Sequence, residues 1–128
     1  MKPLTREWID KAEGDFATAR REIRVRQAPN YDAVCFHAQQ CVEKYLKARL
    51  QEAELSFGRT HDLAALLNLL LSLEPSWESF RPHLRMLTTF AVGVRYPGEA
   101  ADKAMAREAL TLCRDMRRRI RLSLGLEP

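Results

Sequence analysis

Polar side chains recur at helical spacing along the segment Tyr31–Leu50. At about 100° per residue, Gln40, Glu43 and Lys47 fall on one face of a helix. An amide, a carboxylate and an ammonium group side by side offer donors, acceptors and both signs of charge, so this face is available for recognition. The same residues also fit a solvated face on which Glu43 and Lys47 form an i,i+4 pair worth about 0.3 kcal/mol. The segment alone leaves both interpretations open.

The opposite face of this segment is apolar and is expected to pack into a core. It carries Val34, Ala38, Cys41, Val42, Tyr45 and Ala48, whereas Phe36 shares the polar face with His37 and Lys44 beside it. His37 and Tyr45 lie within or beside the buried stripe. Because buried polar groups are normally hydrogen-bonded, we expect both to be satisfied interior groups rather than ligands.

Two short motifs farther along the chain add candidates, His61-Asp62 and Arg95-Tyr96. The His61 imidazole can hydrogen-bond a base or a ribose, or it can sit locally beside a helix start and pack on the second helix. Arg95 can hold a phosphate through two hydrogen bonds, or it can satisfy the carbonyl groups at a helix end. Tyr96 can stack on a base, or it can pack the turn before Pro97.

Cysteine and histidine usage predicts no metal site. The three cysteines, Cys35, Cys41 and Cys113, form no C-x2-C pair, and the three histidines form no H-x3-H set. An odd number of cysteines on apolar helix faces indicates small core residues in a reducing cytoplasm.

The net charge of +4 comes mainly from arginine clusters near the ends of two helical segments. One cluster is Arg20, Arg21, Arg24 and Arg26, and the other is Arg114, Arg117, Arg118, Arg119 and Arg121. Cations at helix C-termini offset the macrodipole, which explains their placement without a ligand. Clustered arginine also suits a phosphate backbone, so RNA binding through these helix ends is an alternative.

Length and periodicity predict one all-α domain over residues 1–128, an up-and-down bundle of four to five helices. A chain of 128 residues can bury one core without metal or disulfide support. The longest apolar run, Leu63–Leu73, is broken by Asn68 and Ser72, and Met1–Arg6 lacks an apolar signal core. We therefore expect a cytoplasmic protein without a membrane span.

Capping and breaking residues set the expected helix boundaries. The first helix is capped by Thr5 and ends before Ala28-Pro29, and the second is capped near Asn30 and runs to about Ala53. The third starts at Thr60 or Asp62, contains Leu63, Leu66, Leu67, Leu70 and Leu73, and ends at Pro75. The fourth is capped by Ser76 and buries Trp77, Phe80, Leu84, Leu87, Phe90 and Val94, with Pro82 in its first turns or splitting it. The fifth runs from about Ala101 to Leu124, and Gly125 follows its end.

Three features in order resemble a known family. They are Phe36-His37-Ala38-Gln39-Gln40 with Glu43-Lys44 and Lys47-Ala48, then Thr60-His61-Asp62-Leu63, then Arg95-Tyr96-Pro97. Together they resemble the HEPN domain, a nucleotide-binding helical module of higher eukaryotes and prokaryotes, over nearly the whole chain. Trp8 and the stretch from Ala12 to Asp15 also suit its first helix. The resemblance implies frequent homodimerisation and frequent pairing with a minimal nucleotidyltransferase, often in toxin and antitoxin arrangements. It also offers the Tyr96 hydroxyl as an acceptor for nucleotidyl transfer.

The sequence departs from the family's ribonucleases at their catalytic motif. Those enzymes resemble one another in an R-x4-6-H motif followed by x-Tyr, in which arginine stabilises phosphate charge and histidine does acid or base work. With that tyrosine placed on Tyr96, Val94 stands where histidine belongs, and none of the residues 87–89 is arginine. No R-x4-6-H occurs before His37, His61 or His83 either. We therefore expect no ribonuclease of that type.

Three functions follow as hypotheses. The first is a non-catalytic module, homodimeric, that joins a minimal nucleotidyltransferase and binds a nucleotide or substrate without a cofactor of its own. Its candidate site residues are Gln40, Glu43, Lys47, His61, Asp62, Arg95 and Tyr96, which could instead hold a subunit interface. The second is a degenerate nuclease that uses His61 with Arg95 or Arg59. The third is an RNA-binding module, which would lose RNA when Arg114, Arg118 and Arg121 are changed to Gln.

Overall fold

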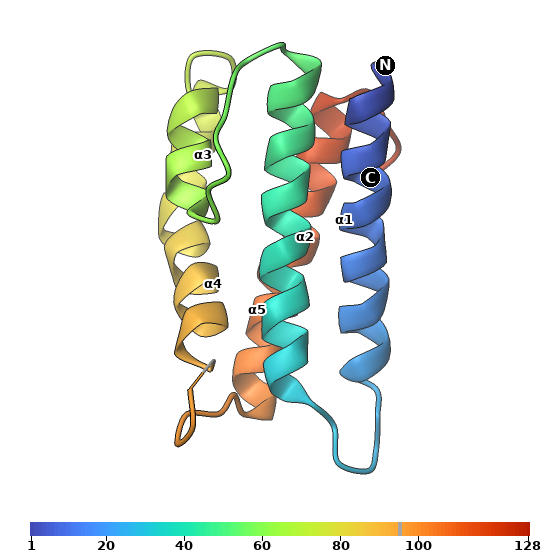
Figure 1. Cartoon of the computed structure of the whole chain (residues 1–128), viewed down its shortest axis with the longest axis vertical. Helices are drawn as coiled ribbons and strands as arrows, with labels where there is room; N and C mark the ends of the chain where they lie inside the picture. Colours follow the sequence, from blue (N-terminus) through green and yellow to red (C-terminus); the bar gives the residue numbers. More distant parts are fainter. Residues whose placement is uncertain (95) are drawn as a thin grey trace.

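The computed structural model describes residues 1–94 and 96–128, and these form helices and connections without a strand. Figure 1 shows the helices lying roughly along one axis. They are α1 (Pro3–Glu22), α2 (Tyr31–Glu52), α3 (Leu63–Leu70), the 3-10 helix η1 (Pro75–Phe80), α4 (Arg81–Gly93) and α5 (Lys103–Ser123). The all-α bundle expected from the sequence is confirmed. Among the helices in the described ranges, none combines the length and apolar character that a membrane span requires.

Helix α2 is the central element of the bundle, because it packs against α1, α3, α4 and α5. The connection after α2 is extended and descends alongside the bundle to about half its height before α3 begins (Figure 1). Helix α3 therefore rises beside the upper half of α2, and α4 returns downward. Residues 55–62 form this descending connection, which runs back along α2 to its middle.

The core lies around α2 and is built from the apolar stripes that the periodicity predicts. Ala12 and Ala19 of α1 and Ala38 and Ala48 of α2 are fully buried. Small side chains at such positions let two helix backbones approach closely, which suits the extensive contact between α1 and α2. All three cysteines are buried as thiols, as expected for core residues.

Side-chain caps fix three of the helix starts. Asn30 accepts a hydrogen bond from the backbone N–H of Ala33, and Asp102 accepts one from Met105. Asp62 accepts from the N–H groups of Ala64 and Ala65 at the start of α3. Such caps satisfy donors that have no partner within the helix. The expected starts of α2 and α3 are therefore confirmed, whereas α5 begins two residues after Ala101.

The first helix begins earlier than expected, and Thr5 does not cap it. Helix α1 starts at Pro3, because proline suits the first turn, where its missing N–H costs nothing. Thr5 is instead fully buried and donates to Glu52 Oε1 at 2.9 Å, which joins the start of α1 to the end of α2. The helix ends at Glu22, which agrees with an end before Ala28-Pro29.

The expected third and fourth helices are shorter than the sequence suggested. Helix α3 ends at Leu70, so Leu73 lies beyond it and is 46% exposed rather than buried. The segment from Pro75 to Phe80 forms the 3-10 helix η1, and α4 begins only at Arg81. Pro82 thus lies in the first turn of α4, one of the two positions expected for it.

Candidate functional site

Glu43 and Lys47 form a buried ion pair in the middle of α2. Lys47 Nζ lies 3.1 Å from Glu43 Oε2, and the two side chains are only 6% and 4% exposed, respectively. The expectation that this face is open to solvent is therefore wrong for both residues. Lys47 is covered by Trp8 of α1, whose ring centroid lies 5.5 Å from Nζ. Because moving both charges out of water is costly, such a pair is weak evidence for a gain in stability.

The descending connection places His61 directly beside this ion pair. His61 Nδ1 lies 2.9 Å from Glu43 Oε1, yet the His61 side chain is 69% exposed. In the neutral tautomer with hydrogen on Nδ1, the bond to Glu43 leaves Nε2 as an acceptor, and in the imidazolium Nε2 is a donor. The buried carboxylate therefore orients an imidazole whose other edge faces solvent.

Two glutamines complete the polar cluster. The buried Gln39 donates from Nε2 to the backbone carbonyl of His61 at 3.1 Å, and its amide nitrogen lies 3.5 Å from Glu43 Oε1. Gln40 donates to Gln39 Oε1 at 3.0 Å. Gln39 thus ties the backbone of the descending connection to α2, a role that sequence reasoning missed. Its position four residues before Glu43 was the available signal.

Asp62 and Tyr96, which the sequence grouped with the polar cluster, have other roles or positions in the structure. Asp62 is occupied as the cap of α3, and its own N–H donates to Thr60 Oγ1 at 3.1 Å, so its role is to fix the turn that carries His61. Tyr96 is 67% exposed in the connection between α4 and α5. Arg95 lies outside the described residues.

The connection that carries Tyr96 is attached to the first turn of α2, whereas the His61 cluster lies in the middle of that helix. The backbone N–H of Ala101 donates to Asp32 Oδ1 at 2.7 Å. Asp32 precedes Glu43 by eleven residues, which corresponds to about 16 Å along the helix axis. The structure therefore brings together Gln40, Glu43, Lys47 and His61 and places Tyr96 elsewhere.

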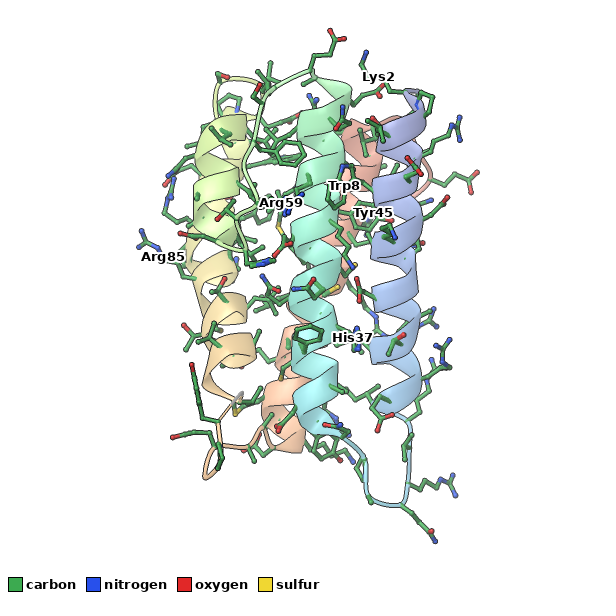
Figure 2. All side chains as sticks on the ribbon, in the orientation of Figure 1. Lys2, Trp8, His37, Tyr45, Arg59 and Arg85 are labelled. Atoms are coloured by element: carbon green, nitrogen blue, oxygen red, sulfur yellow. The ribbon has the colours of Figure 1, made fainter. Side chains whose placement is uncertain are left out.

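A second carboxylate and histidine pair lies lower on α2. His37 Nδ1 is 2.7 Å from Asp15 Oδ1 of α1, and Lys44 Nζ donates to the other oxygen of Asp15. His37 is therefore a satisfied group, as expected. Figure 2 shows His37 on the lower half of α2, well below the level at which Trp8 reaches α2 from α1.

Part of the arginine cluster of α5 is engaged inside the bundle. Arg117 donates to both oxygens of Glu13 at 2.7 and 2.6 Å, and Tyr45 donates its hydroxyl hydrogen to Glu13 at 2.8 Å. Burial alone raises the pKa of Glu13, but the hydrogen bonds from Arg117 and Tyr45 and the charges of Arg117 and Arg121 outweigh it and leave that pKa below its ordinary value.

Other arginines of that cluster remain at the surface. Arg118 and Arg119 line a hollow of about 460 Å³ together with Phe80, Asp115 and Leu122. The Arg119 guanidinium carbon lies 5.6 Å from the centroid of the Phe80 ring. The Phe80 ring is partly buried, and cations beside such a ring can contact phosphate and base together, so this hollow is a surface available for a nucleic acid.

In the ranges that the structure describes, no group of three or more histidine, cysteine, aspartate or glutamate side chains is placed to hold a metal ion. The polar cluster around His61 offers hydrogen bonds and charge, which suits recognition of a polar ligand.

Comparisons with known proteins agree with the helical fold. The family model described as the HEPN domain matches residues 5–122. The fold is similar to the crystal structure of an archaeal HEPN homologue, with a TM-score of 0.70 and 24% sequence identity over 97% of this chain and 99% of that chain. No curated protein matches the sequence.

Proposed function

Because the chain belongs to the HEPN domain family, we propose that it is a non-catalytic helical module that pairs with a minimal nucleotidyltransferase. In that pairing it contributes polar groups to the site of the nucleotide or substrate. The partner is suggested by the family, in which pairing with such enzymes is frequent. The missing R-x4-6-H motif supports a binding role over RNA cleavage.

The observation that carries the proposal is the orientation of His61. Its imidazole is 69% exposed, but its Nδ1 is held at 2.9 Å by a carboxylate that is itself buried. A solvent-facing ring that is already held by a hydrogen bond to a buried carboxylate loses little conformational freedom when it binds a ligand. A structural histidine does not require such exposure, whereas a recognition group does.

The partner is tested by co-purification from the native host in mild salt. A stoichiometric small nucleotidyltransferase in the eluate would support pairing, and its absence at every salt concentration would contradict it. A neighbouring reading frame with Gly-Ser followed by paired aspartates would identify the same enzyme for co-expression and would support a toxin and antitoxin arrangement.

The site is tested by His61→Ala in the co-expressed complex. We expect weaker binding of the nucleotide or of the partner, because the exposed edge of the imidazole is lost. His83→Ala is the matched control, since His83 is an exposed histidine of α4. Equal effects of the two substitutions would contradict a specific role for His61.

Homodimerisation is part of the proposal, and sedimentation that finds only monomer at high concentration would refute it.

A second candidate function, RNA binding, is favoured by the hollow that contains Arg118 and Arg119. The test combines the salt dependence of RNA binding with changes of Arg114, Arg118 and Arg119 to Gln. Arg121 is left unchanged, because it donates to Tyr45 and to the backbone carbonyl of Glu127. Each lost phosphate contact should reduce the slope of log K against log salt by about 1. Unchanged binding by the triple variant would exclude this surface.

A further inference from the structure

A groove of about 310 Å³ lies next to the His61 cluster, farther along α2. It is lined mainly by apolar atoms of six residues: Leu4, Glu7, Trp8 and Lys11 of α1, Gln51 of α2 and Phe57 of the descending connection. Gln51 follows Lys47 by four residues, so the groove continues the same face of α2. Its volume is within the range of small-ligand sites.

Two aromatic rings form the walls of this groove. The centroids of Trp8 and Phe57 are 6.0 Å apart, and their planes meet at 62°. Phe57 also lines a second hollow of about 360 Å³ on the connection, so its ring borders open space in both. The groove therefore offers aromatic surface that is not covered by the rest of the protein.

Polar groups at the groove have the chemistry of base recognition. Gln51 presents an amide that both donates and accepts, and Lys11 and Glu7 add one positive and one negative charge to the lining. Lys47, whose Nζ is 5.5 Å from the Trp8 centroid, connects the groove to Glu43 and through it to His61. Aromatic walls with an amide and a cation fit a flat heteroaromatic ring better than an alkyl chain, because stacking needs a π-face on both partners.

We propose that this groove is the base subsite of a nucleotide, in which the base stacks on Trp8 or Phe57. The ribose and phosphates then extend along α2 toward His61. From Gln51 to Glu43 the helix rises about 12 Å. This inference deepens the proposed function and rests on its nucleotide-binding part.

The test is a titration of the whole chain with ATP, adenosine and ribose 5-phosphate, followed by tryptophan fluorescence. Trp8 is half-buried at the groove, whereas Trp77 is 1% exposed in the core, so quenching reports Trp8. We expect ATP and adenosine to quench the fluorescence and ribose 5-phosphate to leave it unchanged. Trp8→Phe should abolish the signal and retain binding when binding is measured by calorimetry.

Phe57→Leu is the decisive variant, because it keeps the apolar volume and removes the π-face. We expect it to weaken ATP binding by about 5-fold or more, and Phe57→Ala by about 5- to 150-fold. Phe36→Leu is the matched control, since Phe36 is 39% exposed on α2 but does not line the groove. Phe57 is half-buried and packs against the core, so circular dichroism verifies the fold of both variants.

Three results would overturn the proposal. The first is no binding of ATP or adenosine at millimolar concentration, and the second is equal binding by Phe57→Leu and the Phe36 control. The third is loss of the nucleotidyltransferase from Phe57→Ala in the absence of nucleotide binding, which would make the groove a contact for a partner's side chain. In each case, pairing with a nucleotidyltransferase is judged separately by co-purification, so failure of the base subsite is distinguishable from failure of the paired module.

Discussion

Glu43→Gln tests whether the ion pair at the centre of α2 is as isolated from water as its burial indicates. The substitution preserves shape but removes the carboxylate charge 3.1 Å from Lys47 Nζ, in a pair whose side chains are 6% and 4% exposed. It leaves a buried ammonium without a counter-charge, and breaking such a pair costs about 3 to 5 kcal/mol. For a chain of this length, the loss corresponds to a fall in Tm of about 10 to 20 °C.

The double variant separates the charge from the packing. In Glu43→Gln with Lys47→Met, no charge remains buried, so we expect stability within about 1 kcal/mol of the natural protein. The coupling energy of the two substitutions should then exceed about 2 kcal/mol. The double variant also leaves His61 without the carboxylate that orients it, so we expect it to fold and to have weakened ligand binding.

Urea denaturation followed by far-ultraviolet circular dichroism measures these free energies of unfolding. Glu78→Gln is the matched control, since it removes a carboxylate 2.7 Å from Arg81 Nε in a pair in which the Glu78 side chain is 54% exposed. An exposed pair contributes about 0 to 1 kcal/mol. If Glu43→Gln destabilises the protein no more than Glu78→Gln does, the reasoning from burial is refuted.

Three further predictions concern acid stability, thiol reactivity and a helix end. The pKa of Glu13 is lowered in the folded protein, so the stabilisation from its carboxylate is present above about pH 4.5 and is lost as pH falls through the folded pKa. In acid titrations monitored by circular dichroism, Glu13→Gln should flatten this loss of stability. Burial, with the charges of Asp32 and Asp102, raises the pKa of the Cys35 thiol to about 11. Cys35 of the folded protein should therefore resist alkylation at pH 8 and react once urea unfolds the chain. Rapid labelling of the folded protein would contradict this. Gly125 has φ +76° after α5, so Gly125→Ala should cost about 1 kcal/mol in urea denaturation, and an unchanged midpoint would show that the chain end relaxes.

Local sequence signals predicted most of the fold because they act within a few residues. Asn30 and Asp62 cap the helices expected of them, since a cap needs only its own side chain and the next turn. Thr5 was misread as a cap because its partner, Glu52, lies 47 residues away. The helix expected from Ser76 is a 3-10 helix followed by α4 in the structure. A proline at the start of a segment does not distinguish a 3-10 helix from an α-helix.

The sequence predicted several residues of the candidate site but not their burial or their partners. The sequence identified Glu43, Lys47 and His61, yet it could not show that Glu43 and Lys47 are buried, because Trp8 and the descending connection cover them from other parts of the chain. Gln39 was missed for the same reason, since its partner is the backbone of His61, 22 residues away. Tyr96 was grouped with them by order along the chain, which does not determine distance along α2.

The descending connection joins α2, which has helices packed around it, to α3, one of the shortest helices. Amide hydrogens in the middle of α2 should exchange with solvent only when the whole protein opens, whereas those of the eight-residue α3 should exchange through local opening. Because Gln39 and Glu43 of α2 hold His61 one residue before the cap of α3, a ligand that engages the imidazole restrains both elements. Slowed exchange in α3 would therefore be an early sign of an occupied site, recorded at amides that do not touch the ligand.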